Sequence, residues 1–371
     1  MIGIGFPQRL VVIAAVLVTM IACTPTAPLP TPAPTRTPTD YAALKAAIEQ
    51  AITTGPATLD NVRAVVINVD GQTKLAHYRH GHTSSDHEHV WSVTKSVLST
   101  LIGIAIADGL IADLDQPLSS LLPEHRRTMD PDVAKVTLRQ LMSMTAGYYE
   151  DVSRATWEKV IAEDSDFVDL LLERRLALEP GTSFHYSNTS AHLATAVLAA
   201  ALAAADGDHP RSVLDYARTM LFDPLEIQTQ PAWSRPLIDP YGSAFSRAGF
   251  GWGTDPNGIQ LGGYGLRLSA SDMTKLGELY RNDGVWHGKQ VVPAEWIREV
   301  TAPSPINPDY GLLWWIFPRG YQAVGSGGQL IAVLPDSAAV VVIQAATPRG
   351  QEISETDLRR LTEDVIGPAV M

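Results

Sequence analysis

The sequence predicts an α/β protein of the α+β type, in which strands from both ends of the chain form one antiparallel sheet and an all-helical region is inserted between them. Two runs of β-forming residues stand early, at 62–69 and 74–78, and the strongest strand pattern, AAVVVIQA, stands late, at 338–345. From about 114 to 235 the period is helical instead, most clearly at 136–144 and 190–204.

Local patterns predict the other elements in chain order. Residues 41–52 are alanine-rich with a helical period, and Asp70-Gly71 between the first two strands is a hairpin signal. The run 92–107 is apolar nearly all round, which is typical of a buried helix, and Asp108-Gly109 ends it. Gly, Asp and Pro predict long loops over 239–265. The periods that remain predict helices at 272–282 and 356–366 and strands at 310–317, 323–324 and 329–334.

Composition narrows the class of protein. The 371 residues suffice for one large domain or two moderate ones, and 45% apolar with 18% charged residues is a globular profile. A net charge of -12 with few Lys/Arg clusters argues against a nucleic-acid partner. Cys23 is the one cysteine, so no disulfide can form within the chain.

The N-terminal segment resembles a bacterial lipoprotein signal. Arg9 precedes an apolar run at 10–21 that is too short for an ordinary membrane span, and MIAC at 20–23 resembles a lipobox. We therefore expect residues 1–22 to be a signal peptide and Cys23 to be lipidated, with a plain signal peptide or an uncleaved anchor as the alternatives.

A linker rich in proline and threonine follows, at 23–40, and cannot fold. It would hold a catalytic domain, 41–371, outside the cytoplasm and tethered to the cell membrane by the lipid.

Ser92 and Lys95 are the first candidate catalytic residues. They stand three apart at the head of the 92–107 helix, so their side chains lie on one helix face. A neutral or partly desolvated lysine within reach of a serine hydroxyl can take its proton and make it a strong nucleophile. The alternative is a serine that caps the helix beside a solvated lysine.

Two further segments carry residues suited to the same chemistry. After a Pro-Gly turn, Tyr186 can relay a proton to a leaving group, and Asn188 can hold the lysine or a substrate amide. The glycine-rich segment 325–329 precedes a strand, where a substrate backbone can lie against the strand edge and a freed N–H can face an oxyanion. The alternatives are that Tyr186 is a core tyrosine and Ser326 a turn residue.

The motifs SVTK at 92–95, YSN at 186–188 and GSG at 325–327 resemble, in order and spacing, the serine β-lactamase and penicillin-binding-protein superfamily. The tyrosine motif resembles the class C-like branch, which holds β-lactamases, D-alanyl-D-alanine carboxypeptidases, esterases and 6-aminohexanoate-dimer hydrolases. LRQLMSMTAG at 138–147 and GGYGL at 262–266 resemble further family segments. The resemblance implies a β-lactamase/transpeptidase-like fold.

The resemblance also implies roles: Ser92 as nucleophile, Lys95 as its base, Tyr186 as general acid and base, and Asn188 as a positioning group. Ser326, Gly327 and Gly328 would bind substrate or the oxyanion, with the N–H groups of Ser92 and Gly328 forming the oxyanion hole. It implies no metal and no cofactor.

Gly325 departs from the family pattern. β-Lactamases and peptidases of the family usually carry lysine at this position, and many esterases carry histidine. Without a cation, a substrate carboxylate loses roughly 1.5–3 kcal/mol of charged hydrogen bonding. The departure argues against efficient penicillin hydrolysis, and the form G-x-G-G-Q at 325–329 is most similar to the 6-aminohexanoate-dimer hydrolase group.

Three other segments have open interpretations. The run HGHTSSDHEH at 80–89 either binds zinc or is an exposed loop, and residues 148–151 either line the pocket or form a solvated loop. Trp314 and Trp315 alternate faces of a predicted strand, so one is expected in the core and the other against substrate.

The leading functional hypothesis is a serine hydrolase that cleaves a carboxylic ester or amide of a small molecule or peptide through an acyl-serine. A second is a D-alanyl-D-alanine carboxypeptidase or β-lactamase acting on cell-wall peptides or β-lactams. A third, outside enzymes, is a surface-tethered sensor that has kept the penicillin-binding fold.

Overall fold

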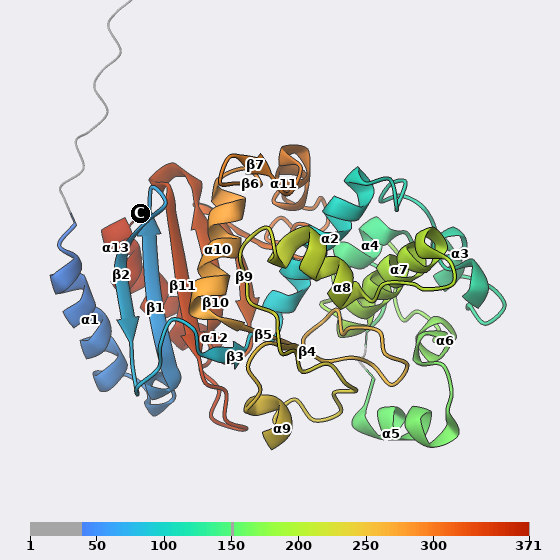
Figure 1. Cartoon of the computed structure of the whole chain (residues 1–371), viewed down its shortest axis with the longest axis horizontal. Coiled ribbons are helices and arrows are strands. Elements are labelled where there is room, and N and C mark those ends of the chain that lie inside the picture. Colours follow the sequence, from blue (N-terminus) through green and yellow to red (C-terminus); the bar gives the residue numbers. More distant parts are fainter. Residues whose placement is uncertain (1–38, 150–151, 371) are drawn as a thin grey trace, which may run out of the picture. The chain divides into compact units, whose positions relative to one another are not determined.

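The computed structural model describes residues 39–149 and 152–370. Its centre is a six-stranded sheet with the order β2-β1-β11-β10-β9-β8, in which every neighbouring pair is antiparallel. The strands are β1 (Val62–Val69), β2 (Gln72–Tyr78), β8 (Trp315–Phe317), β9 (Gly320–Gly325), β10 (Gln329–Leu334) and β11 (Ala339–Ala345). Because β1 pairs directly with β11, the early and late strands form one sheet, which confirms the predicted fold class (Figure 1).

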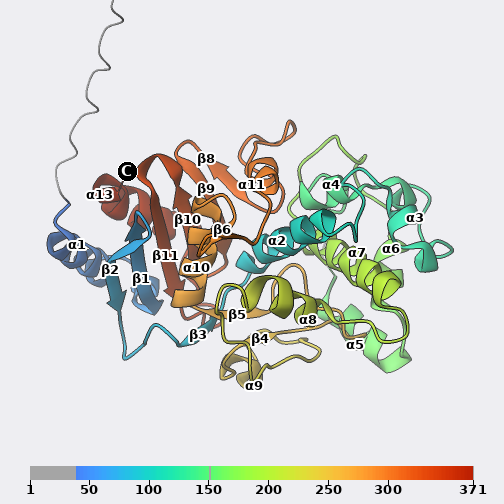
Figure 2. The same ribbon diagram turned by 45° about the horizontal axis from the view of Figure 1, so that its top comes forward.

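Alternate residues of β1 face two different cores. Val65 and Ile67 pack with the terminal helices on one face, and Ala64 and Val66 pack in the larger core on the other. The terminal helices are α1 (Tyr41–Thr54), α12 (Glu355–Arg359) and α13 (Gly367–Val370), with a π-type turn, Arg360–Ile366, between the last two. The opposite face carries α10 (Ala270–Arg281), which contacts β11, β10 and β1 (Figure 2).

Helices dominate between the two groups of strands, as predicted. They are α2 (Val93–Ala107), α3 (Leu118–Leu121), α4 (Leu138–Met142), α5 (Arg154–Glu163), α6 (Phe167–Leu172), α7 (Asn188–Asp206) and α8 (Val213–Ala217). The helix α2 contacts β9 and β10 at the sheet and α7 in the helical region, so it joins the two (Figure 1). The helix α7 is long and apolar enough to cross a membrane, but 61% of its apolar window is buried inside the protein.

The segment after α8 is built mainly of loops and small sheets. It contains α9 (Ser243–Ser246), β4 (Gly251–Trp252), β5 (Leu266–Ser269), the hairpin of β6 (Val285–Trp286) and β7 (Lys289–Gln290), and α11 (Ala294–Val300). The strand β3 (His87–His89) pairs with β5, in a small sheet of order β3-β5-β4. This pairing brings the residues just before α2 beside the loop that precedes β5.

Two predicted elements are shorter in the structure. The strand predicted at 310–317 forms only from Trp315, because Leu313 has a left-handed backbone (φ 65°) that an extended strand does not allow. The helix predicted at 136–144 begins at Leu138, because the Thr137 side chain accepts the Gln140 N–H and caps it there. The helix ends at Met142, because Met144 two residues later has a left-handed backbone (φ 59°) that an α-helix cannot include.

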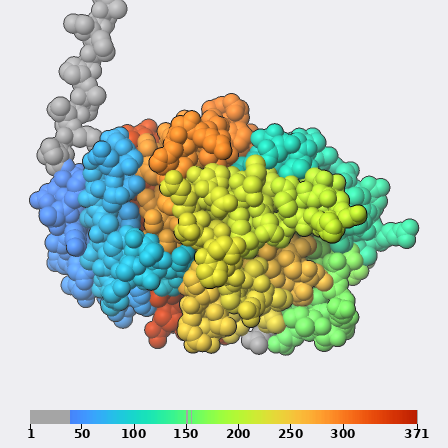
Figure 3. Space-filling model, viewed as in Figure 1, coloured from blue at the N-terminus to red at the C-terminus, as the bar shows by residue number. Residues whose placement is uncertain are grey.

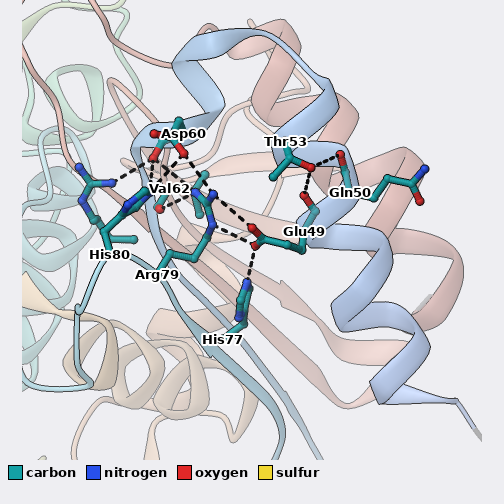
Figure 4. Close-up of polar contacts among 9 residues, drawn as sticks. Glu49, Gln50, Thr53, Asp60, Val62, His77, Arg79 and His80 are labelled. Atoms are coloured by element: carbon teal, nitrogen blue, oxygen red, sulfur yellow. Dashed lines mark hydrogen bonds and ion pairs between the residues drawn. The ribbon is translucent and has the colours of Figure 1, made fainter.

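Polar contacts attach α1 to the β1–β2 edge of the sheet (Figure 4). Glu49 of α1 accepts from His77 at 2.8 Å and from Arg79 Nε at 3.0 Å, and Arg79 also pairs with Asp60 at 3.1 Å. The hydrogen bond from His77 holds the pKa of Glu49 below its usual value. Cys23, the signal peptide and residues 23–38 of the linker lie outside the described residues, so the lipidation site and the domain boundaries stay predictions.

Candidate active site

Ser92 and Lys95 meet as their spacing predicts. Ser92 occupies the N-cap position of α2, yet its side chain caps no backbone N–H, and its Oγ lies 3.1 Å from Lys95 Nζ. Lys95 is only 1% exposed. The alternative of a capping serine beside a solvated lysine is therefore wrong.

Two oxygens from distant segments fix the Lys95 amine. Its Nζ donates to Asn188 Oδ1 at 2.6 Å and to the Gly263 carbonyl oxygen at 2.8 Å. Amide and carbonyl oxygens can only accept, whereas the Ser92 hydroxyl can also donate. An unprotonated Lys95 that keeps both of these bonds therefore turns its lone pair toward the Ser92 proton. This is the geometry that a lysine general base requires.

Tyr186 lies beside the Lys95 amine. Lys95 Nζ is 4.6 Å from the centre of the Tyr186 ring, which is half-buried rather than part of the core. The ring stacks on Trp315 (centroids 5.7 Å apart, planes at 21°) and meets Tyr310 edge-on at 6.1 Å. Stacking on Trp315 therefore fixes the plane of the Tyr186 ring, whose hydroxyl would act as general acid and base.

The loop that carries Tyr186 is held at both ends. The Gly181 N–H donates to the Thr145 carbonyl at 2.8 Å, and the His185 N–H donates to the Met144 carbonyl at 2.8 Å. Ser187 then caps α7 by accepting the Ser190 N–H, which makes Asn188 the first residue of that helix. Segments 138–147 and 186–188, quoted separately from the sequence, are thus one structural unit.

Trp91, directly before Ser92, has an unusual backbone. Its φ of 48° is left-handed, a conformation that costs a bulky residue on the order of 1–3 kcal/mol. Its indole N–H donates to Thr347 Oγ1 at 3.0 Å, and its ring lies 4.1 Å from that of His89. These contacts hold the turn that delivers Ser92 to the start of α2.

The glycine-rich turn between β9 and β10 lies beside this segment. A Cβ on Gly325 would overlap the Val90 carbonyl oxygen and come within 3.1 Å of Trp91 Cβ. Gly327 and Gly328 instead face Thr347 and Ile353, and their φ values of 76° and 102° require glycine. Ser326 is exposed at the tip. Gly325, directly before Ser326, is thus the residue of the turn that lies next to the residues that precede Ser92.

The histidines of 80–89 have separate partners. His80 Nε2 lies 3.0 Å from the Asp60 carbonyl, and His82 Nε2 lies 2.9 Å from Gln344 Oε1. His87 lies 3.7 Å from Asp272, whereas His89 is buried and accepts the Gly265 N–H at 3.0 Å. Burial holds the pKa of His89 well below its usual 6.5. The run is therefore only partly exposed, and His89 supports the loop that carries Gly263.

Other sequence expectations have mixed outcomes. Trp314 is buried, as expected for the core residue of the pair, and the half-buried Trp315 stacks on Tyr186, although only Trp315 lies in a strand. Tyr148 is a core residue whose hydroxyl donates to the Leu171 carbonyl, while Tyr149 is 58% exposed and stacks on His185. Residues 150 and 151 lie outside the described residues.

Sequence reasoning missed the Gly263 carbonyl and the strained turn at Trp91. The segment 262–266 resembles a family segment, but no sequence pattern shows where a backbone oxygen points.

The chain is similar in sequence and in structure to known proteins of one family. The family model described as Beta-lactamase matches residues 57–364. Among solved structures, a putative 6-aminohexanoate-dimer hydrolase from Bacillus anthracis is 21% identical, with a TM-score of 0.61 over 84% of this chain and 79% of its own. A class C β-lactamase from Rhodobacter sphaeroides is 19% identical, with a TM-score of 0.62 over 89% and 99%. EstCE1, a hydrolase with promiscuous acyltransferase activity, is 17% identical, with a TM-score of 0.61 over 89% and 100%.

The fold and the family together define a serine hydrolase of the β-lactamase and penicillin-binding type. The chain belongs to the Beta-lactamase family, as its motifs led us to expect.

Proposed function

We propose that this protein hydrolyses a carboxylic ester or amide through an acyl-serine intermediate on Ser92. One observation carries the proposal: the buried Lys95 amine is held by the Asn188 side chain and the Gly263 carbonyl, and it lies 3.1 Å from the Ser92 hydroxyl. A lysine with a purely structural role does not need that arrangement.

The reaction follows from this geometry. Unprotonated Lys95 takes the Ser92 proton as Oγ attacks the substrate carbonyl carbon, and the carbonyl electron pair moves to its oxygen. The tetrahedral intermediate collapses, and the alcohol or amine leaves with a proton delivered through Tyr186. Water then attacks the acyl-serine while Tyr186 and Lys95 accept its proton, and Ser92 regains a proton as the carboxylic acid departs.

Two backbone N–H groups would stabilise the negative oxygen of the intermediates. The Ser92 N–H is one donor in this proposal. Sequence reasoning placed the second at Gly328, but Gly328 faces Ile353, whereas Gly325, directly before Ser326, lies against the segment before Ser92. We therefore assign the second donor to the Ser326 N–H.

The structure at Gly325 supports an ester or amide substrate over a β-lactam. A side chain cannot replace the glycine without displacing the Val90 carbonyl, so this position cannot present a cation to a substrate carboxylate.

A substrate screen tests this function. Purified protein is assayed against p-nitrophenyl esters, short linear amides and penicillins, alongside labelling by a fluorophosphonate probe. Ester or amide turnover with probe on Ser92 supports the proposal. Efficient turnover of penicillins alone favours the β-lactamase alternative, and specific ligand binding with no labelling and no turnover favours a sensor.

We also propose that the protein is a lipoprotein, anchored to the cell membrane through Cys23. The lipobox-like MIAC at 20–23 and the proline-rich segment after it support this. In bacterial cells fed an alkyne fatty acid, the wild-type protein should become labelled and partition with membranes. A Cys23→Ser variant that stays equally labelled would contradict the proposal.

A further inference from the structure

Asn188 and Gly263, which hold the Lys95 amine, come from two segments that meet along one face of α7. Gly262 lies so close to the first turn of α7 that a Cβ on it would overlap the Ala191 carbonyl oxygen. Figure 3 shows the region from outside, where the yellow-green surface of α7 and α8 adjoins the gold surface of the segment after α8. The position of the Gly263 carbonyl relative to the Asn188 amide therefore depends on how this segment is attached to α7.

A buried hydrogen bond between His192 and Asp255 makes that attachment. His192 Nε2 lies 3.0 Å from Asp255 Oδ2, and the two side chains are 5% and 0% exposed. Because a carboxylate can only accept, the His192 ring donates from Nε2. His192 stands one helical turn after Asn188 on α7, so the side chains of these two residues lie on the same helix face. Asp255 precedes Gly263 in the segment that reaches the Lys95 amine.

Asp255 also fixes the turn that leads to Gly263. Its Oδ1 accepts the N–H groups of Asn257 and Ile259, each at 2.9 Å. Its own N–H donates to the Ile259 carbonyl oxygen at 2.8 Å. One carboxylate therefore joins α7, through Oδ2, to the backbone just before Gly263, through Oδ1.

Stability alone does not account for a polar pair at this place. The net stabilisation from a buried hydrogen bond is small, because both groups give up hydrogen bonds to water. His192 Nδ1 is also buried with no hydrogen-bond partner among the described residues, a cost that an apolar side chain would avoid. Apolar contact is non-directional, however, whereas a hydrogen bond requires a narrow range of distances and angles. The pair therefore fixes where the segment lies along α7, and with it the separation of Asn188 and Gly263.

We propose that His192 and Asp255 are positioning residues for the general base Lys95. Their hydrogen bond sets the separation of Asn188 Oδ1 and the Gly263 carbonyl oxygen, and these two atoms hold the amine at 2.6 and 2.8 Å. Neither residue touches the substrate or exchanges a proton during the reaction. The inference rests on the proposed function, because Lys95 acts as a base only in that reaction.

Steady-state kinetics on a p-nitrophenyl ester compare two substitutions of the histidine. His192→Leu removes the donor and should lower kcat about 10- to 100-fold with KM unchanged, since misplacing a catalytic group by about 1 Å can cost about 100-fold. His192→Gln should keep most of the wild-type kcat, because its amide nitrogen can donate to Asp255 from nearly the same place. A wild-type kcat in His192→Leu overturns the proposal, and so does an equal loss of kcat in both variants. If His192→Leu does not fold, His192→Asn, whose amide is too short to reach Asp255, takes its place.

His125→Leu is the matched control for lost stability. His125 Nδ1 lies 2.8 Å from Asp169 Oδ1, so this second histidine–aspartate hydrogen bond joins α6 to the segment after α3. The substitution should lower the melting temperature and leave kcat unchanged. A fall in kcat as large as that in His192→Leu would show that lost stability, rather than a displaced base, lowers the rate, and would overturn the proposal.

Crystal structures of the variants separate this inference from the proposed function, because they need no turnover. In His192→Leu, Lys95 Nζ should lie more than about 3.5 Å from Asn188 Oδ1 or from the Gly263 carbonyl oxygen, beyond hydrogen-bond distance. In His192→Gln both contacts should remain. Unmoved contacts in His192→Leu overturn the inference and leave the reaction at Ser92 untouched. Displaced contacts in a protein whose wild type hydrolyses no ester or amide support the inference and contradict the proposed function alone.

Discussion

Asn188 Oδ1 lies 2.6 Å from Lys95 Nζ, closer than Ser92 Oγ at 3.1 Å. The shorter bond joins the first residue of α7 to the first turn of α2, and the Gly263 carbonyl closes the other side. The amine is thus held by two groups that cannot give it a proton, with the Ser92 hydroxyl within reach. The reactivity of the serine depends on this pair of fixed acceptors.

Gly263→Ala should lower kcat without unfolding the protein. A Cβ at this position would lie 2.5 Å from Asn188 Oδ1, so the amide must move and Lys95 loses its fixed orientation. Gly249→Ala is the control, because a Cβ there meets nothing within 4 Å. Steady-state kinetics on a p-nitrophenyl ester compare the two. Equal kcat values in these variants would show that the Asn188 contact does not position the base.

Lys95→Met should lower kcat by about 10²–10⁴-fold, the usual contribution of a general base. It should also lower the free energy of unfolding by about 1–3 kcal/mol, because the Asn188 amide oxygen and the Gly263 carbonyl lose their donor. Lys135→Met, at an exposed lysine, should change neither quantity. Ester kinetics and urea denaturation measure both effects. A Lys95→Met enzyme with wild-type kcat would remove the lysine from the mechanism.

Ser326→Pro should reduce kcat far more than Ser326→Ala. Proline removes the backbone N–H that we assign to the oxyanion hole, whereas alanine removes only the exposed hydroxyl. Loss of one oxyanion donor costs about 10²–10³-fold in kcat. If proline is tolerated at Ser326 with normal kcat, the second donor lies elsewhere in the turn, and Gly328 returns as the candidate.

Stability should fall as the pH drops below about 6.5, in part because of His89. Burial depresses the pKa of His89 in the native state, so the unfolded chain binds a proton near 6.5 while the native protein does not. The contribution of neutral, buried His89 to the free energy of unfolding is constant above about pH 6.5 and is lost below it. His89→Gln, which keeps an acceptor for the Gly265 N–H, should flatten the decline, and His209→Gln on the surface should not. Urea midpoints from about pH 7.5 to 5.5 measure it. An unchanged pH slope in His89→Gln would contradict this account.

Most of the fold could be predicted because its signals are local. The β1–β2 hairpin has the Asp70-Gly71 turn signal, strand β11 is a continuous run of β-branched residues, and α2 is apolar nearly all round. A strand was wrongly predicted before Trp315, because the left-handed Leu313, whose N–H donates to the Met142 carbonyl, is held by tertiary contacts rather than by its own preference. The same limit applies in the site. Side-chain types revealed Ser92 and Lys95, whereas the Gly263 carbonyl is a backbone atom that no composition can reveal.

Intact-protein mass spectrometry after mixing with a slowly released ester tests the central claim most directly. The wild type should gain the mass of the acyl group, peptide mapping should place it on Ser92, and Ser92→Ala should gain nothing while keeping its melting temperature. An acyl group on another residue, or hydrolysis that persists in Ser92→Ala, would contradict the account.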